Sequence, residues 1–77
     1  MDKIHFYRGR IEGTLDSLRY YIAARSAVEA ENKMLRDFDN NPTLNSFVGE
    51  VIELAVFRIF PEEYYGLKGK IDSKFLD

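Results

Sequence analysis

Several residue types that build reactive or cross-linked sites are absent or rare. The 77-residue sequence contains no cysteine and no tryptophan, one histidine and two prolines. Without cysteine the chain forms no disulfide bond and offers no thiolate to a metal ion or a substrate. The balance of 11 Lys+Arg against 13 Asp+Glu gives a net charge of −2, which excludes a strongly basic protein that coats nucleic acid. These figures predict a single globular domain.

The sequence also lacks a long hydrophobic segment. Apolar runs such as residues 54–57 are far shorter than the roughly 20 residues that span a bilayer. Residues 1–5 have no apolar stretch of the kind that forms the core of a signal peptide. We therefore expect a soluble, cytoplasmic protein with no membrane partner; the alternative is a secreted protein without cysteines.

Residues 15–38 carry the pattern of a long helix. Thr14 precedes this stretch as a candidate N-cap, and Asp16 suits the positive end of a helix. Alanines, which favour helix, lie between larger side chains that recur at steps of three and four. One predicted helix face is formed by Leu18, Tyr21, Ile22, Arg25, Val28, Asn32 and Leu35.

A second helix is predicted over 42–60. Asn41 is a suitable N-cap, Pro42 suits the first helical position, and Pro61 disfavours a helical Phe60. Apolar side chains surround most of this helix, so one neighbouring helix cannot bury them all. The expected fold class is therefore mainly all-α: an antiparallel two-helix hairpin, with short terminal elements, that pairs into a homo-oligomeric bundle, most simply a homodimer. The alternative is a monomer whose termini cover the exposed face. The expected oligomer interface comprises Phe47, Val51, Leu54, Val56 and Phe57.

The two ends of the chain are less regular. Residues 1–13 combine β-branched and aromatic side chains with glycines, which is typical of an arm or a short strand, although the first turns of a helix also fit. Residues 61–77 begin with one helical turn that Gly66 is expected to close. A tail follows, in which a short docking helix is the weaker alternative.

Catalytic motifs are missing from the sequence. It contains no phosphate-binding loop, nucleophile elbow or zinc-binding helix motif, and no partner is fixed beside His5. Glu50 and Glu53 have the spacing of carboxylates that share a divalent cation on a helix. Such a site also needs carboxylates or histidines from a facing helix, and the sequence offers too few of them. A metal-dependent nucleotide hydrolase is therefore the weakest alternative. We expect no enzymatic activity, no catalytic residue, no metal and no cofactor.

Arg25 interrupts the apolar face of the first predicted helix. A buried unpaired charge is very costly, so a partner is needed. In the predicted hairpin Arg25 lies one turn from Glu53, and we favour an Arg25–Glu53 ion pair. The alternative is that Arg25 lines a site for an anionic ligand.

Basic and aromatic residues alternate near the N-terminus. Arginine binds phosphate through two parallel hydrogen bonds and tyrosine can stack on a base, so this combination suits a nucleotide or another phosphorylated ligand. If residues 1–13 are extended, Arg8 and Arg10 point to the same side. The candidate ligand-binding residues are Tyr7, Arg8, Arg10, Arg19, Tyr20 and Arg25.

Acidic residues are concentrated in the predicted hairpin, which carries eight of them against three basic residues between positions 26 and 63. Such a surface suits a basic protein partner. The first functional hypothesis is therefore a small helical homo-oligomer that regulates another macromolecule, as bacterial and phage accessory proteins and inhibitors do. The second is an oligomeric binder of a nucleotide or other phosphorylated ligand. The candidate partner-binding residues are Asp37, Asp39, Glu62 and Glu63.

Overall fold

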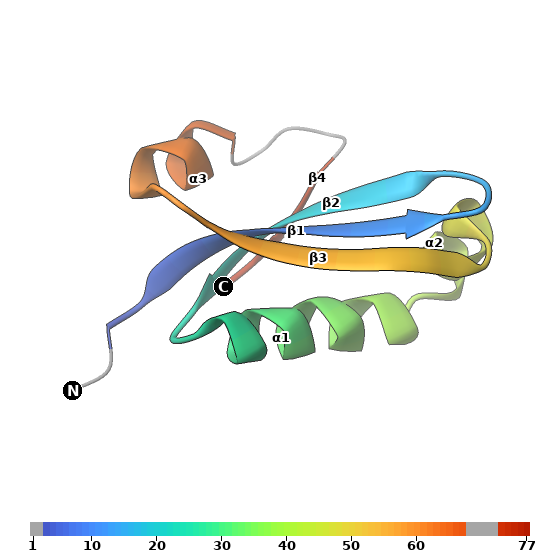
Figure 1. Ribbon diagram of the computed structural model, residues 1–77, viewed down its shortest axis with the longest axis horizontal. Coiled ribbons are helices and arrows are strands. Elements are labelled where there is room, and N and C mark those ends of the chain that lie inside the picture. Colours follow the sequence, from blue (N-terminus) through green and yellow to red (C-terminus); the bar gives the residue numbers. More distant parts are fainter. Residues whose placement is uncertain (1–2, 68–72) are drawn as a thin grey trace.

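A four-stranded sheet forms the centre of the computed structural model, which describes residues 3–67 and 73–77. In space the strands follow the order β3-β1-β2-β4 (Figure 1). β1 pairs antiparallel with both β2 and β3, and β2 pairs in parallel with β4. In chain order the elements are β1 (His5–Gly13), β2 (Ser17–Ala24), α1 (Ala27–Asp39), α2 (Pro42–Val48), β3 (Val51–Ile59), α3 (Pro61–Leu67) and β4 (Ser73–Leu76).

The expected all-α fold is wrong, because the chain forms a mixed α/β domain. The predicted helix over 15–38 is a strand in its first half and a helix only from Ala27. Tyr20, Tyr21 and Ile22 are consecutive and almost fully buried, since β2 lies between two other strands and is covered on both faces. A strand buried on both faces shows no alternation of apolar and polar residues, and its sequence resembles a buried helix.

The predicted helix over 42–60 is also wrong beyond its first two turns. Its start is confirmed, because Asn41 caps α2 and Pro42 occupies the first turn. The helix ends at Gly49, whose φ of 80° is readily adopted only by glycine. The rest is β3, which is rich in β-branched residues that favour strands. The apolar residues that would surround a helix instead lie on both faces of this edge strand.

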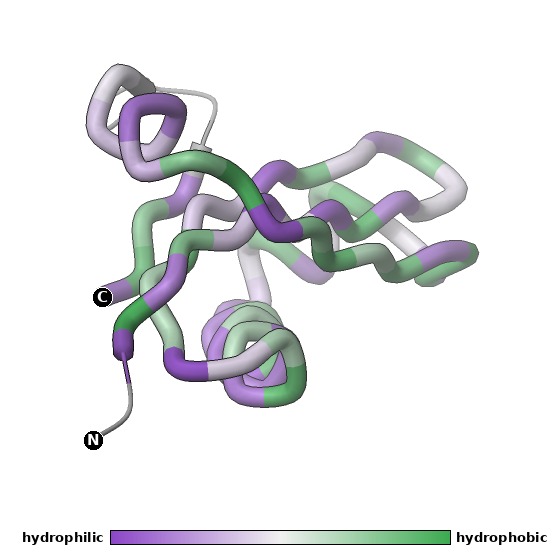
Figure 2. The backbone as a smooth tube through the Cα atoms, turned by 60° about the vertical axis from the view of Figure 1, so that its left-hand side comes forward, coloured by the Kyte–Doolittle hydropathy of each residue, from purple (hydrophilic) through white to green (hydrophobic). Residues whose placement is uncertain are grey.

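The hydrophobic core lies between the sheet and α1. The odd-numbered residues of β1 point to α1, and Tyr7 and Ile11 are buried there. On α1 the buried positions recur every four residues, at Ala30, Met34 and Phe38. Figure 2 shows α1 nearly end-on against one side of the sheet, with α3 on the other side. The sheet therefore has one face covered by α1 and an opposite face, which we call the open face.

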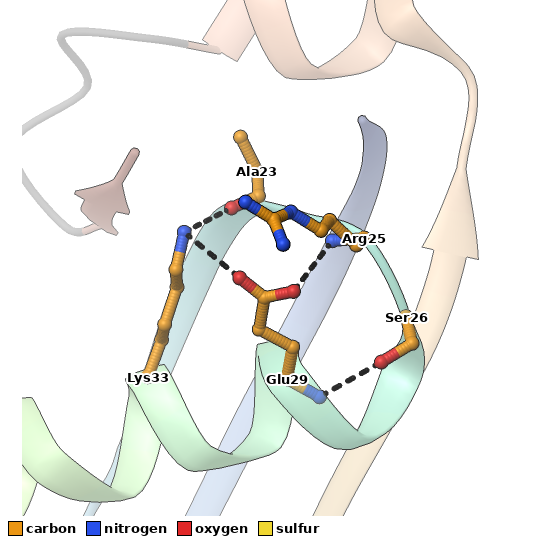
Figure 3. A network of polar contacts seen from close by, with 5 residues as sticks. All are labelled: Ala23, Arg25, Ser26, Glu29 and Lys33. Atoms are coloured by element: carbon orange, nitrogen blue, oxygen red, sulfur yellow. Dashed lines mark hydrogen bonds and ion pairs between the residues drawn. The ribbon is translucent and has the colours of Figure 1, made fainter. Parts of the chain in front are cut away.

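A polar network fixes the start of α1 at the end of β2 (Figure 3). The Ser26 hydroxyl accepts a hydrogen bond from the Glu29 amide at 3.1 Å, as an N-cap does. The Glu29 carboxylate in turn accepts from the Arg25 amide at 3.1 Å. Lys33 donates to the Ala23 carbonyl at 2.6 Å and lies 4.0 Å from Glu29. The helix therefore begins twelve positions later than the Thr14 cap predicted from the sequence.

A second set of contacts joins the β1–β2 turn to the turn before β3. The Thr14 amide donates to the Glu50 carbonyl at 2.9 Å, and the Glu50 amide donates to the Thr14 hydroxyl at 3.2 Å. The Leu15 amide donates to the Val48 carbonyl at 2.9 Å. A Cβ atom on Gly13 would overlap that same Val48 carbonyl. Glycine at this position therefore permits the close approach of the two turns.

The C-terminal elements only partly match expectation. The helical turn predicted after residue 61 is confirmed as α3, although Gly66 lies within it rather than closing it. The tail ends in the strand β4 and not in a docking helix, while residues 68–72 lie outside the described chain. None of the described helices is long and apolar enough to cross a membrane.

Candidate functional site

Three arginines lie together on the open face of the sheet. Residues 1–13 were expected as an arm or strand, and the strand β1 places Arg8 and Arg10 on the same side, as the extended alternative predicts. The register of the β1–β2 pair sets Arg19 directly opposite Arg10. The β1–β3 register sets Phe57 directly opposite Arg8. Three of the four arginines in the predicted ligand-binding set therefore lie on one face, and only the strand pairing brings Phe57 to them.

An aromatic cluster covers one end of the open face. The ring of Phe6 lies 4.6 Å from that of Tyr64 and 5.4 Å from that of Tyr65, centroid to centroid. Phe75 of β4 stacks on Tyr21 at 5.4 Å. The Tyr64 hydroxyl donates to Asp77, and burial together with this carboxylate raises the pKa of Tyr64. α3 therefore closes this end of the face and leaves the arginines beyond it exposed.

The arginines differ in their ion pairs. Arg8 lies 3.5 Å from the Glu63 carboxylate of α3, and Arg10 lies 3.0 Å from Glu12 on its own strand. Within residues 3–67 and 73–77, Arg19 has no carboxylate partner. Two like charges directly opposite each other in an antiparallel pair destabilise the sheet. The Arg10–Arg19 pair is therefore an unfavourable arrangement that an anion would relieve.

A hollow of about 880 Å³ extends from this arginine cluster. It passes round the edge of β2, where β4 does not pair with Ser17 and Leu18, and reaches α2. Its charged lining consists of four cations (the three arginines and Lys74) and one carboxylate, Asp16. Glu12 of β1 and Glu53 of β3 lie opposite each other in the β1–β3 pair. Neither carboxylate lines the hollow. The hollow therefore combines an excess of positive charge with apolar walls, which Phe57, Leu44 and Phe47 provide.

The two tyrosines predicted to bind the ligand lie elsewhere. Tyr7 and Tyr20 point to the α1 side, where their exposed fractions are 5% and 0%. They belong to the core and cannot stack on a ligand. Burial, and then the nearby Asp37 carboxylate, raise the pKa of the Tyr20 hydroxyl.

Arg25 is also separate from the arginine cluster. It lies in the turn between β2 and α1, where its side chain is exposed and its amide donates to Glu29. The expected Arg25–Glu53 pair is wrong, because the two-helix hairpin that would bring these residues together does not form. Glu53 instead lies on β3, opposite Glu12 of β1.

The predicted acidic partner-binding residues are divided between the two ends of the molecule. Asp37 and Asp39 lie at the C-terminal end of α1, whereas Glu62 and Glu63 begin α3 at the other end of the long axis (Figure 1). Asp37 lies 3.9 Å from Lys74, and Glu63 pairs with Arg8. These four residues do not form one acidic surface.

Glu50 and Glu53, the metal-site alternative, are not on a common helix. Glu50 lies in the turn before β3, and Glu53 lies within that strand. No group of three or more His, Asp or Glu side chains gathers to hold a metal ion in the described part of the chain. His5 contacts Arg58, whose guanidinium lies 2.7 Å from the Nδ1 atom of His5.

The predicted interface residues lie on several surfaces. Val51 and Phe57 point to the open face, and Leu54 and Val56 point to the α1 side of β3. Phe47 lies on α2, where it is 49% exposed and lines the hollow. These residues do not share one surface, because the apolar helix predicted over 42–60 does not form.

Phe57 and Lys74 line the hollow but are not among the ligand-binding candidates that the sequence indicates. The sequence instead predicts Phe57 in an oligomer interface, because the pattern of residues 42–60 favours a helix. The signal that identifies β3 is its density of β-branched residues after Gly49, a helix-ending glycine. Lys74 follows a stretch without periodicity, so its position beside β2 has no clear signal in the sequence.

Comparisons of the chain with protein-family models, with curated proteins and with solved structures find no match.

Proposed function

We propose that this protein is a non-enzymatic binding protein that holds a nucleotide, free or within a single strand, on the open face of its sheet. The observation that carries the proposal is the Arg10–Arg19 pair. Placing two guanidinium groups directly opposite each other costs stability. A bound phosphate bridging both groups offsets that cost, and arginine is suited to bind phosphate through two hydrogen bonds.

Phe57 supplies the second element of the proposed site. It is 54% exposed and directly opposite Arg8 in the β1–β3 register. An exposed aromatic ring beside arginines is the arrangement on which bases stack in proteins that bind single strands. A phosphate at Arg10 and Arg19 and a base on Phe57 together account for the neighbouring basic and apolar parts of the hollow.

The acidic-surface hypothesis has weaker support. Its four residues are split between two ends of the molecule, and two of them are engaged in ion pairs. The net charge of −2 limits non-specific attraction of polyanions, so binding depends on the local arginine cluster. We therefore favour the phosphorylated ligand as the main function.

The test uses fluorescence anisotropy of a labelled single-stranded oligothymidine, with unlabelled thymidine monophosphate and triphosphate as competitors. The variants are Arg19→Ala, which removes a phosphate contact, and Phe57→Ala, which removes the stacking surface. Arg36→Ala is the matched control, because Arg36 is an exposed arginine on α1, behind the sheet. Displacement by mononucleotides indicates a free nucleotide as ligand, whereas binding of the oligomer alone indicates a single strand.

The two variants are expected to weaken binding in distinguishable ways. Arg19→Ala should lower the slope of log affinity against log salt by about 0.7, the value for one phosphate contact on a single strand. Phe57→Ala should weaken binding by about 1–3 kcal/mol with an unchanged salt slope. If Arg36→Ala weakens binding as much as Arg19→Ala, or if no probe binds at low salt, the proposed function is wrong.

A further inference from the structure

β3 is a long edge strand with few of the features that normally prevent edge pairing. One side of β3 pairs with β1, and no described strand pairs with the other side. Natural edge strands are usually short, or carry lysine, proline or a bulge that opposes pairing with another chain. β3 has nine residues with no lysine and no proline, and its only charges are Glu53 and Arg58. An irregularity in its pairing with β1 is confined to one end, where Glu12 pairs with Glu53 and Gly13 with Val51. The other edge strand, β4, has only four residues.

Exposed apolar side chains gather along this edge. Ten large hydrophobic side chains are exposed in the described chain, and five of them fall between residues 51 and 60. On the α1 side, Ile52 is 67% exposed, and Val28 of α1 is 68% exposed. Leu54 and Val28 line a small cleft of about 240 Å³ between β3 and α1. An apolar edge of this kind marks an interaction surface.

We propose that this edge pairs with β3 of a second copy of the chain, antiparallel across a two-fold axis. A strand that meets its own copy has a partner of equal length and matching pattern. If the axis passes between Ala55, the midpoint of β3, and its copy, the two strands overlap along their full length of nine residues. Leu54 then lies opposite the partner subunit's Val56, and Val51 lies opposite the partner subunit's Ile59. No like charges oppose each other, because Glu53 meets the partner subunit's Phe57.

This geometry determines how the two copies combine. Two edges can pair antiparallel only if the two-fold axis is perpendicular to the sheet, and such a rotation keeps each face on its own side. The dimer therefore contains one continuous eight-stranded sheet, with both α1 helices on one side and both open faces on the other. The inference rests on the β3 edge alone and stands whether or not the open face binds a nucleotide.

Sedimentation equilibrium of the unmodified chain at micromolar concentrations tests the pairing first. The expected mass is twice the 9.0 kDa of one chain. Ile52→Lys places a charge on the paired edge and should yield monomers with an unchanged circular dichroism spectrum. Leu15→Lys is the control, because Leu15 is 72% exposed and lies in the β1–β2 turn rather than on β3.

A cysteine introduced into this cysteine-free chain tests the register. Directly opposite side chains of an antiparallel pair approach closely enough for a disulfide. Ala55→Cys should therefore give a covalent dimer with oxidised glutathione, and Ala27→Cys at the exposed start of α1 should not. A 9.0 kDa monomer for the unmodified chain overturns the proposal. So does a dimer that persists in Ile52→Lys and shows no cross-link through Ala55→Cys.

Discussion

Arg10 and Arg19 lie directly opposite each other across the antiparallel β1–β2 pair, on the face of the sheet that α1 does not cover. Arg10 is compensated by Glu12, but Arg19 has no carboxylate partner in the described parts of the chain. The sheet therefore retains a repulsive pair at a solvent-exposed position. Two positive charges that are held close together, one of them without a carboxylate partner, are expected at a binding site for an anion.

Replacing one of these arginines should separate stability from binding. Arg19→Glu converts the repulsive pair into an attractive one, so the free energy of unfolding should rise by about 0.2–1 kcal/mol. The same variant should lose affinity for the labelled oligothymidine. Urea denaturation at low salt measures the first effect, and anisotropy measures the second. A loss of stability in Arg19→Glu would show that Arg19 serves the fold.

The two turns joined through Thr14 and Glu50 should be sensitive to added volume. Gly13→Ala forces a Cβ atom against the backbone carbonyl of Val48, which cannot move as a side chain can. We expect a loss of about 1–3 kcal/mol in urea denaturation. Gly66→Ala is the control, because no atom lies near its added Cβ and alanine favours the helix. Equal effects of the two substitutions would contradict the close packing of these turns.

The N-cap of α1 should make a measurable contribution to stability. Ser26→Ala removes the acceptor of the Glu29 amide and should lower the free energy of unfolding by about 1 kcal/mol. Ser26→Asp retains an acceptor and should restore most of that loss. Thr14→Ala should leave the helix itself intact, because Thr14 lies in the β1–β2 turn. A helical signal that changes in Thr14→Ala and not in Ser26→Ala would contradict this boundary.

Two buried tyrosines predict a loss of stability in alkali. Burial and a neighbouring carboxylate raise the pKa of Tyr20 and of Tyr64 above the value of about 10 found in unfolded chains. The unfolded chain therefore loses these protons first. The contribution of the two tyrosines to the free energy of unfolding is constant below about pH 9 and falls as the pH rises beyond about 10. Urea denaturation at pH 8 and pH 10.5 measures the loss. Tyr64→Phe should reduce it, because this variant lacks one of the two groups whose pKa is raised.

The sequence predicts local signals better than it predicts pairing. The Asn41 cap, the Pro42 start and the helical turn after Pro61 depend on neighbouring residues, and all three are present. The predictions of two long helices are wrong because steps of three and four between apolar residues also occur in strands that are buried on both faces or apolar on both faces. Whether residues 17–24 form a strand depends on their pairing with β1 and β4, which no local pattern contains.

In the candidate site too, local spacing predicts the position of some residues, and only long-range pairing determines the position of the others. Arg8 and Arg10 were placed on one side from their spacing in an extended segment, and this prediction is confirmed. Arg19 joins them only through the register of the hairpin, and Phe57 only through the long-range β1–β3 pair. Tyr7 could stack on a base, but it is an odd-numbered residue of β1 and therefore points to α1, where its ring is buried. Side-chain direction in a strand alternates with every residue, so the assignment of strands decides which aromatics reach the site.

The arginine side-chain resonances of the protein test the binding of nucleotides at the open face most directly. In a nitrogen-15 correlation spectrum, each Nε–Hε group reports its own surroundings during titration with unlabelled oligothymidine. Nucleotide binding at the open face predicts saturable shifts for Arg10 and Arg19, a smaller shift for Arg8, and none for Arg36 on α1. Shifts confined to Arg36 or Arg25, or the absence of any shift at low salt, would contradict it.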